Sequence, residues 1–298
     1  MDPSRQPTQP TQPTQPLVLL VTCADWPEGE PGHGALDAAL EARGLTGRWV
    51  VWDDLSIDWG AADVVAVRST WDYDARLGEF LGWASGVGPA LLNGVDVFRW
   101  NTDKHYLVEL QAAGLPVVPT VAAETVFDVR AAADDFGLAV VKPRVGAGGR
   151  GLEVVADGRI WLPDPAGHAG PWIVQPLVES IHHDGEISVF MIAGHPVSQV
   201  VKLPGTSDIR VHERFGGTMR SVTVSREAAL LAAEAIATVV DLLGAEVVYG
   251  RVDMMRHRGR LVVSEIELTE PGLYLDVLPL NALPFADAIA ARAIPRTW

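Results

Sequence analysis

The stretch Val140-Val-Lys-Pro-Arg-Val-Gly-Ala-Gly-Gly-Arg-Gly151 runs from an apolar strand end through a Lys-Pro pair into four glycines within six residues. Glycine tolerates positive φ and lets backbone N–H groups approach an anion closely. The pattern therefore predicts a phosphate-binding loop. The competing interpretation is an ordinary glycine-rich hairpin turn, which isolated glycine clusters commonly form.

The spacing of Gly146, Gly148 and Gly151 also fits the dinucleotide-binding pattern G-x-G-x-x-G. That pattern requires a helix directly after the glycines. Here the residues from Leu152 to Ala156 predict a strand instead. A strand–loop–strand arrangement favours a flexible lid over phosphates, and Lys142, just upstream, provides a cation for the same anion.

Length and composition bound the class of protein. The chain has 298 residues, 48% of them hydrophobic, which is enough for a sizeable core divided into two or three lobes. A net charge of −15 disfavours nucleic acid and acidic membrane surfaces. We find no membrane-length apolar run and no signal-peptide pattern, so we expect a cytoplasmic protein. The single cysteine, Cys23, excludes an internal disulfide and a Cys-cluster zinc site.

The first hundred residues predict a tail and an α/β domain. Residues 1–16 repeat Thr-Gln-Pro three times and offer no aromatic or branched aliphatic side chain to bury, which predicts disorder. Residues 17–100 follow the order strand, helix, strand, strand, which is typical of a small lobe with a largely parallel sheet.

The third strand runs into the cluster Arg68-Ser-Thr-Trp-Asp-Tyr73, at a strand end where open α/β sheets bind ligands. The alternative is that Ser69 or Thr70 caps a helix that begins near Asp74. Asp25 follows the first strand and is a further candidate for the same crevice.

A further helix is predicted from about Thr102 to Ala113, with Thr102 as its N-cap. Lys104 would then lie in the first turn, where a cation opposes the helix dipole. We interpret this unfavourable position as a sign that Lys104 faces an anion. An exposed lysine with no such role is the alternative.

Three carboxylates are expected to converge near the end of the chain. Asp253 lies on one predicted strand, and Glu265 and Glu267 lie two residues apart on the next, so both glutamates share a face. Carboxylates held together repel one another unless a cation neutralises them, and hard oxygen ligands suit Mg²⁺. A solvated acidic sheet face is the alternative, which the otherwise apolar strands disfavour.

The order of these motifs resembles the ATP-grasp superfamily over roughly residues 17–292. The motifs are Asn101-Thr-Asp-Lys104, Val141-Lys-Pro143 with the glycine loop, Gln175-Pro-Leu-Val-Glu179, Tyr249-Gly-Arg-Val-Asp253 and Glu265-Ile-Glu267. The resemblance implies an α/β fold with α+β lobes. An N-terminal α/β domain would precede an ATP-grasp lid subdomain (101–178) and a C-terminal subdomain (179–298).

The resemblance also implies residue roles. The ATP-binding residues would be Lys104, Lys142, Gly146, Gly148, Gly149, Gly151, Gln175, Val178 and Glu179, with the lysines and glycines at the phosphates, 175–178 at the adenine and Glu179 at the ribose. The metal ligands would be Asp253, Glu265 and Glu267, holding Mg²⁺ or alternatively Mn²⁺. Glu267 departs from the asparagine usual at this position, which adds negative charge and leaves the number of metal ions open.

Further segments are similar to particular ATP-grasp ligases. Asp208-Ile-Arg210 with Gly216-Gly217 resembles the ligases related to glutathione synthetase and ribosomal-protein glutamate ligase. Residues 68–73, 98–104 and 265–271 look most like the cyclo-ligase that forms D-cycloserine from O-ureido-D-serine. These likenesses imply catalytic roles for Arg251, Arg210 and Lys202. They imply substrate contacts for Asp25, Arg68, Thr70, Trp71, Arg214 and Glu270.

The implied function is ATP-dependent ligation. A substrate carboxylate would be activated as an acyl phosphate and attacked by a nitrogen nucleophile within the same small amino-acid-like molecule. The alternatives are an intermolecular carboxylate–amine ligase and a nucleotide-binding protein without turnover, which the intact Lys142, Arg251, Asp253 and Glu265 disfavour. We expect no nucleic-acid or membrane partner, and a homodimer as the assembly.

Overall fold

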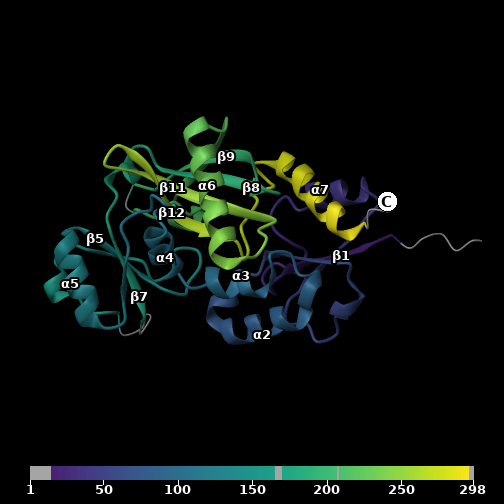
Figure 1. Cartoon of the computed structure of the whole chain (residues 1–298), viewed down its shortest axis with the longest axis horizontal. Helices are drawn as coiled ribbons and strands as arrows, with labels where there is room; N and C mark the ends of the chain where they lie inside the picture. Colours follow the sequence, from purple (N-terminus) through teal and green to yellow (C-terminus); the bar gives the residue numbers. More distant parts are fainter. Residues whose placement is uncertain (1–14, 165–169, 207, 295–298) are drawn as a thin grey trace, which may run out of the picture.

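The computed structural model describes residues 15–164, 170–206 and 208–294, and these form three sheets (Figure 1). All but two residues of the expected N-terminal tail lie outside the described residues. No helix of the described part combines the length and apolar character needed to cross a membrane.

The N-terminal sheet is parallel, with strand order β2-β1-β3. Its strands are β1 (Leu17–Thr22), β2 (Thr46–Val51) and β3 (Val64–Ser69). β1 and β3 are apolar and buried along nearly their whole length, as parallel strands covered on both faces must be. The accompanying helices are α1 (Gly34–Glu41), α2 (Leu77–Val87) and α3 (Gly94–Asn101). The predicted parallel sheet is confirmed.

The last helix of the chain, α7 (Ala282–Ala293), belongs to the same layer. Figure 1 shows this yellow helix beside the purple N-terminal segment. Phe285 and Ile289 are fully buried in one core cluster with Val18 and Leu36. Helix α7 therefore covers the first sheet. The predicted boundary instead places all residues from 179 onward in the C-terminal subdomain.

The lid sheet has strand order β4-β7-β5-β6 and is antiparallel. Its strands are β4 (Val121–Ala123), β5 (Ala139–Pro143), β6 (Glu153–Val155) and β7 (Trp172–Pro176). Helix α5 (Val126–Phe136) covers it and begins at a capping box formed by Thr125 and Asp128. The glycine stretch joins the paired strands β5 and β6, which confirms the strand–loop–strand prediction. Gly148, Gly149 and Gly151 all have positive φ there.

The largest sheet is antiparallel, with order β10-β9-β8-β11-β12. Its strands are β8 (Glu186–Ile192), β9 (His195–Leu203), β10 (Thr218–Val222), β11 (Tyr249–His257) and β12 (Arg260–Glu267). Helix α6 (Arg226–Leu243) covers one face, where Val252 and Ile266 share its core cluster. Because side chains alternate along a strand, the polar residues between them face the other side.

The segment around Lys104 differs from its prediction. The expected helix from Thr102 to Ala113 is instead the end of α3 followed by α4 (Tyr106–Ala112). Thr102 is the C-cap of α3, and its hydroxyl donates to the carbonyl of Phe98. Lys104 therefore lies in the turn between two helices, one residue before the N-cap of α4, and not inside the first turn of a long helix.

The proposed cap before Asp74 is also wrong. The Ser69 hydroxyl lies 2.7 Å from the Thr22 hydroxyl and forms a hydrogen bond with it rather than with a helix end. The segment that follows is a short 3₁₀ helix, η2 (Tyr73–Arg76), which leads into α2. Other short 3₁₀ segments are η1 (Trp59–Ala61), η3 (Gly88–Ala90), η4 (Gly158–Ile160), η5 (Glu179–His182), η6 (Glu213–Phe215) and η7 (Pro279–Asn281).

Candidate active site

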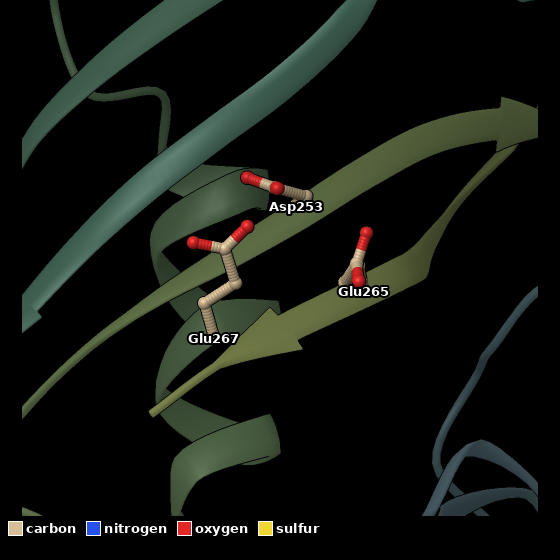
Figure 2. A group of neighbouring side chains, drawn as sticks. All are labelled: Asp253, Glu265 and Glu267. Carbon is tan, nitrogen blue, oxygen red and sulfur yellow. The ribbon is translucent and has the colours of Figure 1, made fainter. Parts of the chain in front are cut away.

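The three expected metal carboxylates converge on the open face of the largest sheet. Asp253 on β11 pairs directly with Glu265 on β12, and Glu267 follows two residues later. One oxygen of each lies within 4.8 Å of the others, and Figure 2 shows the side chains gathered from the two neighbouring strands. Three hard oxygen donors at this spacing fit a shared Mg²⁺ ion.

Basic side chains surround this triad. The Arg251 guanidinium donates to Asp253 at 2.9 and 2.8 Å and also contacts Glu267. Lys104 Nζ lies 3.1 Å from Glu265. Lys202 Nζ lies 3.0 Å from Glu186 and 3.5 Å from Asp253. The carboxylates are thus neutralised by the groups expected to bind phosphates.

These contacts shift the acid–base properties of the site. Burial raises the pKa of Asp253, but Arg251 and Lys202 outweigh it, so the pKa of this carboxyl falls well below its usual range. Burial has the larger effect on Glu267 and, despite the opposing charge of Arg251, raises its pKa to about 7, with repulsion from Asp253 and Glu265. The site therefore holds acids of very different proton affinity within one cluster.

Lys104 and Lys142 lie at the base of the glycine loop. Lys104 Nζ donates to the carbonyl of Gly146 at 2.7 Å, and its backbone N–H donates to the carbonyl of Arg144. Burial lowers the pKa of Lys142, and the nearby positive charge of Lys104 lowers it further. Two lysines held together in a buried place are suited to a polyanion such as a triphosphate.

The glycine loop is fastened to the N-terminal domain. Arg150 donates to both carboxylate oxygens of Asp74, at 2.6 and 2.7 Å, and to the carbonyl of Trp71 at 3.2 Å. The backbone N–H of Ala147 also donates to Asp74. We call the Arg150–Asp74 pair the lid latch.

The opposite side of the loop contacts the segment that carries Arg210. A Cβ placed on Gly149 would lie 3.1 Å from Arg210 Cδ, so a larger residue there would push against this arginine. Arg210 pairs with Asp208, and its guanidinium lies 3.4 Å from the centre of the Phe215 ring. A hollow of about 400 Å³ lies beside it, lined by Leu152, Val154, His182, Thr206, Asp208, Ile209 and Arg210. Arg214 is exposed on η6.

The segment expected at the adenine presents backbone rather than side chains. Gln175 is buried, and its amide donates to the Thr120 hydroxyl at 2.9 Å. Val178 packs in a small core cluster with Val118 and Val262. Within residues 175–179, the main chain and the exposed side chain of Glu179 are therefore the groups that can contact a nucleotide.

Two of the expected substrate residues are interior. Arg68 is fully buried, donates to Glu30 at 2.9 Å and to the carbonyl of Pro271 at 2.9 Å, and lies over the ring of Phe285. Thr70 is also fully buried. The expectation that Arg68 contacts substrate does not agree with this burial and pairing, whereas the Thr70 hydroxyl has no hydrogen-bond partner among the described residues.

The remaining expected substrate residues lie nearer the surface or the acids. Trp71 packs edge to face with Trp26, their ring centres 5.6 Å apart. Asp25 is exposed in the turn after β1. Glu270 is buried directly after β12, and burial together with repulsion by Glu267 raises its pKa to about 8.

Several residues of the site were not anticipated from the sequence. Ser188 donates to Asp253 at 2.5 Å, and Glu186 pairs with Lys202. Their two-residue spacing on β8 was a usable signal, because it puts both on the face of the acids. The Tyr274 ring lies 5.5 Å from Arg251 and 5.7 Å from Lys202, which no local pattern indicates.

Comparison with known proteins agrees with this geometry. Residues 18–93 match the family model "D-cycloserine synthetase DcsG, N-terminal domain", and residues 107–273 match "Prokaryotic glutathione synthetase, ATP-grasp domain". The cycloserine biosynthesis protein DcsG of Streptomyces lavendulae is 32% identical over 86% of this chain and 92% of its own. The tetrahydromethanopterin:alpha-L-glutamate ligase of Methanosarcina acetivorans is 27% identical over 55% of each chain.

Solved structures agree with the sequence matches. The crystal structure of D-cycloserine synthetase DcsG superposes with a TM-score of 0.82 at 30% identity, covering 93% of this chain and all of that one. D-alanine–D-alanine ligase from Bacillus anthracis shares the fold, with a TM-score of 0.63 at 16% identity, covering 93% of this chain and 97% of that one.

The lid hairpin, the lysines beneath it and the acidic strand pair define an ATP-grasp ligase, which joins carbon to nitrogen at the expense of ATP. Enzymes of this class use ATP and Mg²⁺. Within the class, the chain belongs to the family of DcsG.

Proposed function

We propose that the protein closes O-ureido-D-serine to D-cycloserine at the expense of ATP. The observation that carries this proposal is the similarity to DcsG, which extends over the N-terminal domain as well as the ATP-grasp part. The N-terminal domain supplies Trp71 and Asp74, which contact the lid loop. The N-terminal segment that contacts the lid loop therefore lies within the residues that match the DcsG N-terminal model.

The proposed reaction has two stages. The substrate carboxylate attacks the γ-phosphorus of ATP, which forms an acyl phosphate and releases ADP. The ureido nitrogen bonded to oxygen then displaces phosphate and closes the ring. The carbamoyl group leaves as CO₂ and NH₃, with one water consumed overall. Because the nucleophile belongs to the same molecule, the rate depends on how the site folds a single substrate.

The basic residues bind and stabilise the developing charge. Lys104 and Lys142 would hold the phosphates beneath the glycine loop, with adenine at the main chain of 175–178 and ribose at Glu179. Arg251 and Lys202 would offset charge on the transferring phosphoryl group, and Arg210 would hold the acyl phosphate. Mg²⁺ held by Asp253, Glu265 and Glu267 would supply charge neutralisation at the phosphate oxygens.

The deciding experiment measures ADP release by purified protein with Mg·ATP and O-ureido-D-serine as the only other substrate. Mass analysis of the product follows, with Glu265→Gln as the inactive control. We expect ADP together with D-cycloserine. No ADP with this substrate would contradict the proposal.

An intermolecular carboxylate–amine ligase is the second candidate, since residues 107–273 match the glutathione synthetase domain. It predicts ADP release only when another amino acid and an amine are both supplied. The same assay with those additions separates the two reactions.

The finer expectations from the sequence belong to this proposal. They are Mn²⁺ as a substitute for Mg²⁺, a homodimer, and a cytoplasmic location without nucleic-acid partners, in keeping with a net charge of −15. Restoring activity with Mn²⁺ after EDTA treatment and measuring sedimentation velocity would test the first two.

A further inference from the structure

Glu270 is a buried carboxylate that bonds to its own backbone N–H but to no other residue in the described part of the chain. Only 7% of this residue is exposed, and no group of another described residue forms a hydrogen bond or ion pair with its carboxylate. The other buried acids of the site differ in this respect. Asp253 has Arg251 and Ser188, and Glu30 has Arg68.

The loop that carries Glu270 is anchored on both sides. Before it, Leu268 N–H and the Thr269 hydroxyl donate to the Asn101 side-chain oxygen, at 2.7 and 3.2 Å. After it, the carbonyl of Pro271 accepts from Arg68, and Leu273 N–H donates to Glu30. These four hydrogen bonds anchor the chain on both sides of Glu270, so the side chain projects from a fixed segment.

The surroundings do not compensate the charge of Glu270. Burial disfavours it, and the like charge of Glu267 disfavours it further, while Lys104 and Arg251 oppose these effects only partly because both are committed to other carboxylates. An unpaired buried carboxylate is unfavourable unless a cation or a proton joins it.

The loop at Glu270 contacts the N-terminal domain. A Cβ on Gly272 would lie 3.8 Å from Trp71 Cζ2, so the loop abuts residues 70–73. The hydroxyl of Thr70 has no partner within the described residues, although it is fully buried. Two unpaired polar side chains thus occur on adjoining loops, one from each domain, which is the arrangement expected where a polar ligand is missing.

We propose that Glu270 is the specificity residue that receives the α-ammonium group of the amino-acid substrate. The ligand class is an α-amino acid, whose carboxylate would be activated beside Arg251 while its ammonium group supplies the cation that Glu270 lacks. Glu270 would orient the substrate and does not itself react. This inference rests on the proposed function, because it uses the same substrate.

The experiment compares two substrates on three proteins. The substrates are O-ureido-D-serine and its analogue without the α-amino group. The proteins are the wild type, Glu270→Gln, which keeps the shape and removes the charge, and Asp276→Asn, which removes an exposed acid from the same segment. KM and kcat for each substrate are measured from ADP release with saturating Mg·ATP.

In the wild type we expect the analogue to have a KM roughly 30-fold higher than O-ureido-D-serine, as for loss of one partner of a buried charge pair. Glu270→Gln should raise KM for O-ureido-D-serine by a similar factor and abolish the discrimination, with KM for ATP unchanged. Asp276→Asn should behave as the wild type does. The melting temperature of Glu270→Gln should not fall, since an uncompensated charge is removed.

Two results would overturn the inference in distinguishable ways. If the wild type releases ADP and Glu270→Gln still discriminates between O-ureido-D-serine and its analogue, the proposed function stands. Glu270 is then not the residue that binds the ammonium group. No ADP from the wild type with O-ureido-D-serine would overturn the proposed function, and the inference with it.

Discussion

Single residues of the acidic site differ in how many partners depend on them. Asp253 is 2% exposed and compensates Arg251 and Lys202 at once, so its removal leaves each of these buried cations with one carboxylate fewer, Glu267 for Arg251 and Glu186 for Lys202. The side chain of Glu265 is 28% exposed and, among the described residues, forms an ion pair with Lys104 alone. Loss of one partner from a buried ion pair costs about 3–5 kcal/mol, whereas an accessible pair contributes about 1 kcal/mol or less.

We therefore expect two variants to share a loss of activity and to differ in stability. Glu265→Gln should reduce ADP formation by about 10³-fold, as loss of a metal ligand costs several kcal/mol of transition-state stabilisation. Asp253→Ala should lose as much activity and also about 3–5 kcal/mol of unfolding free energy. ADP assays and urea unfolding check both, with the exposed Asp96→Asn as a control. Near-wild-type turnover in either variant would remove the metal assignment.

Among the secondary-structure elements, the lid hairpin β5–β6 is joined through its loop to the N-terminal domain by a side-chain pair. Asp74 is held against Arg150 with 8% of its side chain exposed, but 39% of the Arg150 side chain is exposed, so the lid latch is shielded from water on the Asp74 side. A buried hydrogen bond to a charged group contributes about 1.5–3 kcal/mol and an exposed ion pair about 1 kcal/mol or less, so this pair contributes about 1–2 kcal/mol. The latch therefore favours the closed position of the glycine loop.

Asp74→Asn should open this loop. We expect KM for ATP to rise about tenfold while kcat at saturating ATP changes little, because part of the binding energy must then close the loop. Trypsin should cut faster after Arg144 or Arg150, and Mg·ATP should restore protection. Unchanged cleavage in Asp74→Asn would show that the latch does not hold the loop.

At the scale of the whole molecule, the two ends of the described chain share one core. Phe285 of α7 is fully buried with residues of β1 and of β8, so the N-terminal sheet and the largest sheet pack against common side chains. Arg68 lies over the same ring. The two parts of the chain should therefore unfold together.

Phe285→Ala tests this coupling. Loss of a buried phenylalanine costs about 3–5 kcal/mol, so we expect a large fall in the urea midpoint with a single transition for all probes. Leu283→Ala, on the 46% exposed neighbour in the same helix, should cost about 1 kcal/mol or less. Two separated transitions in either protein would show that the domains unfold independently.

Local patterns were sufficient for elements whose ends and faces are determined by neighbouring residues. Helices α5 and α6 begin at the side-chain caps Thr125 and Ser225, each of which accepts from a backbone N–H three residues further on. The glycine hairpin likewise follows from the order of neighbouring residues. The shared face of Glu265 and Glu267 follows from their two-residue separation on one strand, and Asp253 lies on the adjoining strand.

The sequence by itself thus determined the ATP-grasp class, the lid and the acidic strand pair, because each depends on contacts between near neighbours or on ordered motifs. Only the tertiary structure decided that Arg68 is an interior residue, that α7 covers the first sheet and that Asp74 latches the lid. Arg68 bonds to Pro271, 203 residues away, and Arg150 to Asp74, 76 residues away. Which side chain is buried or paired at such separations depends on how whole domains pack, and no local periodicity carries that information.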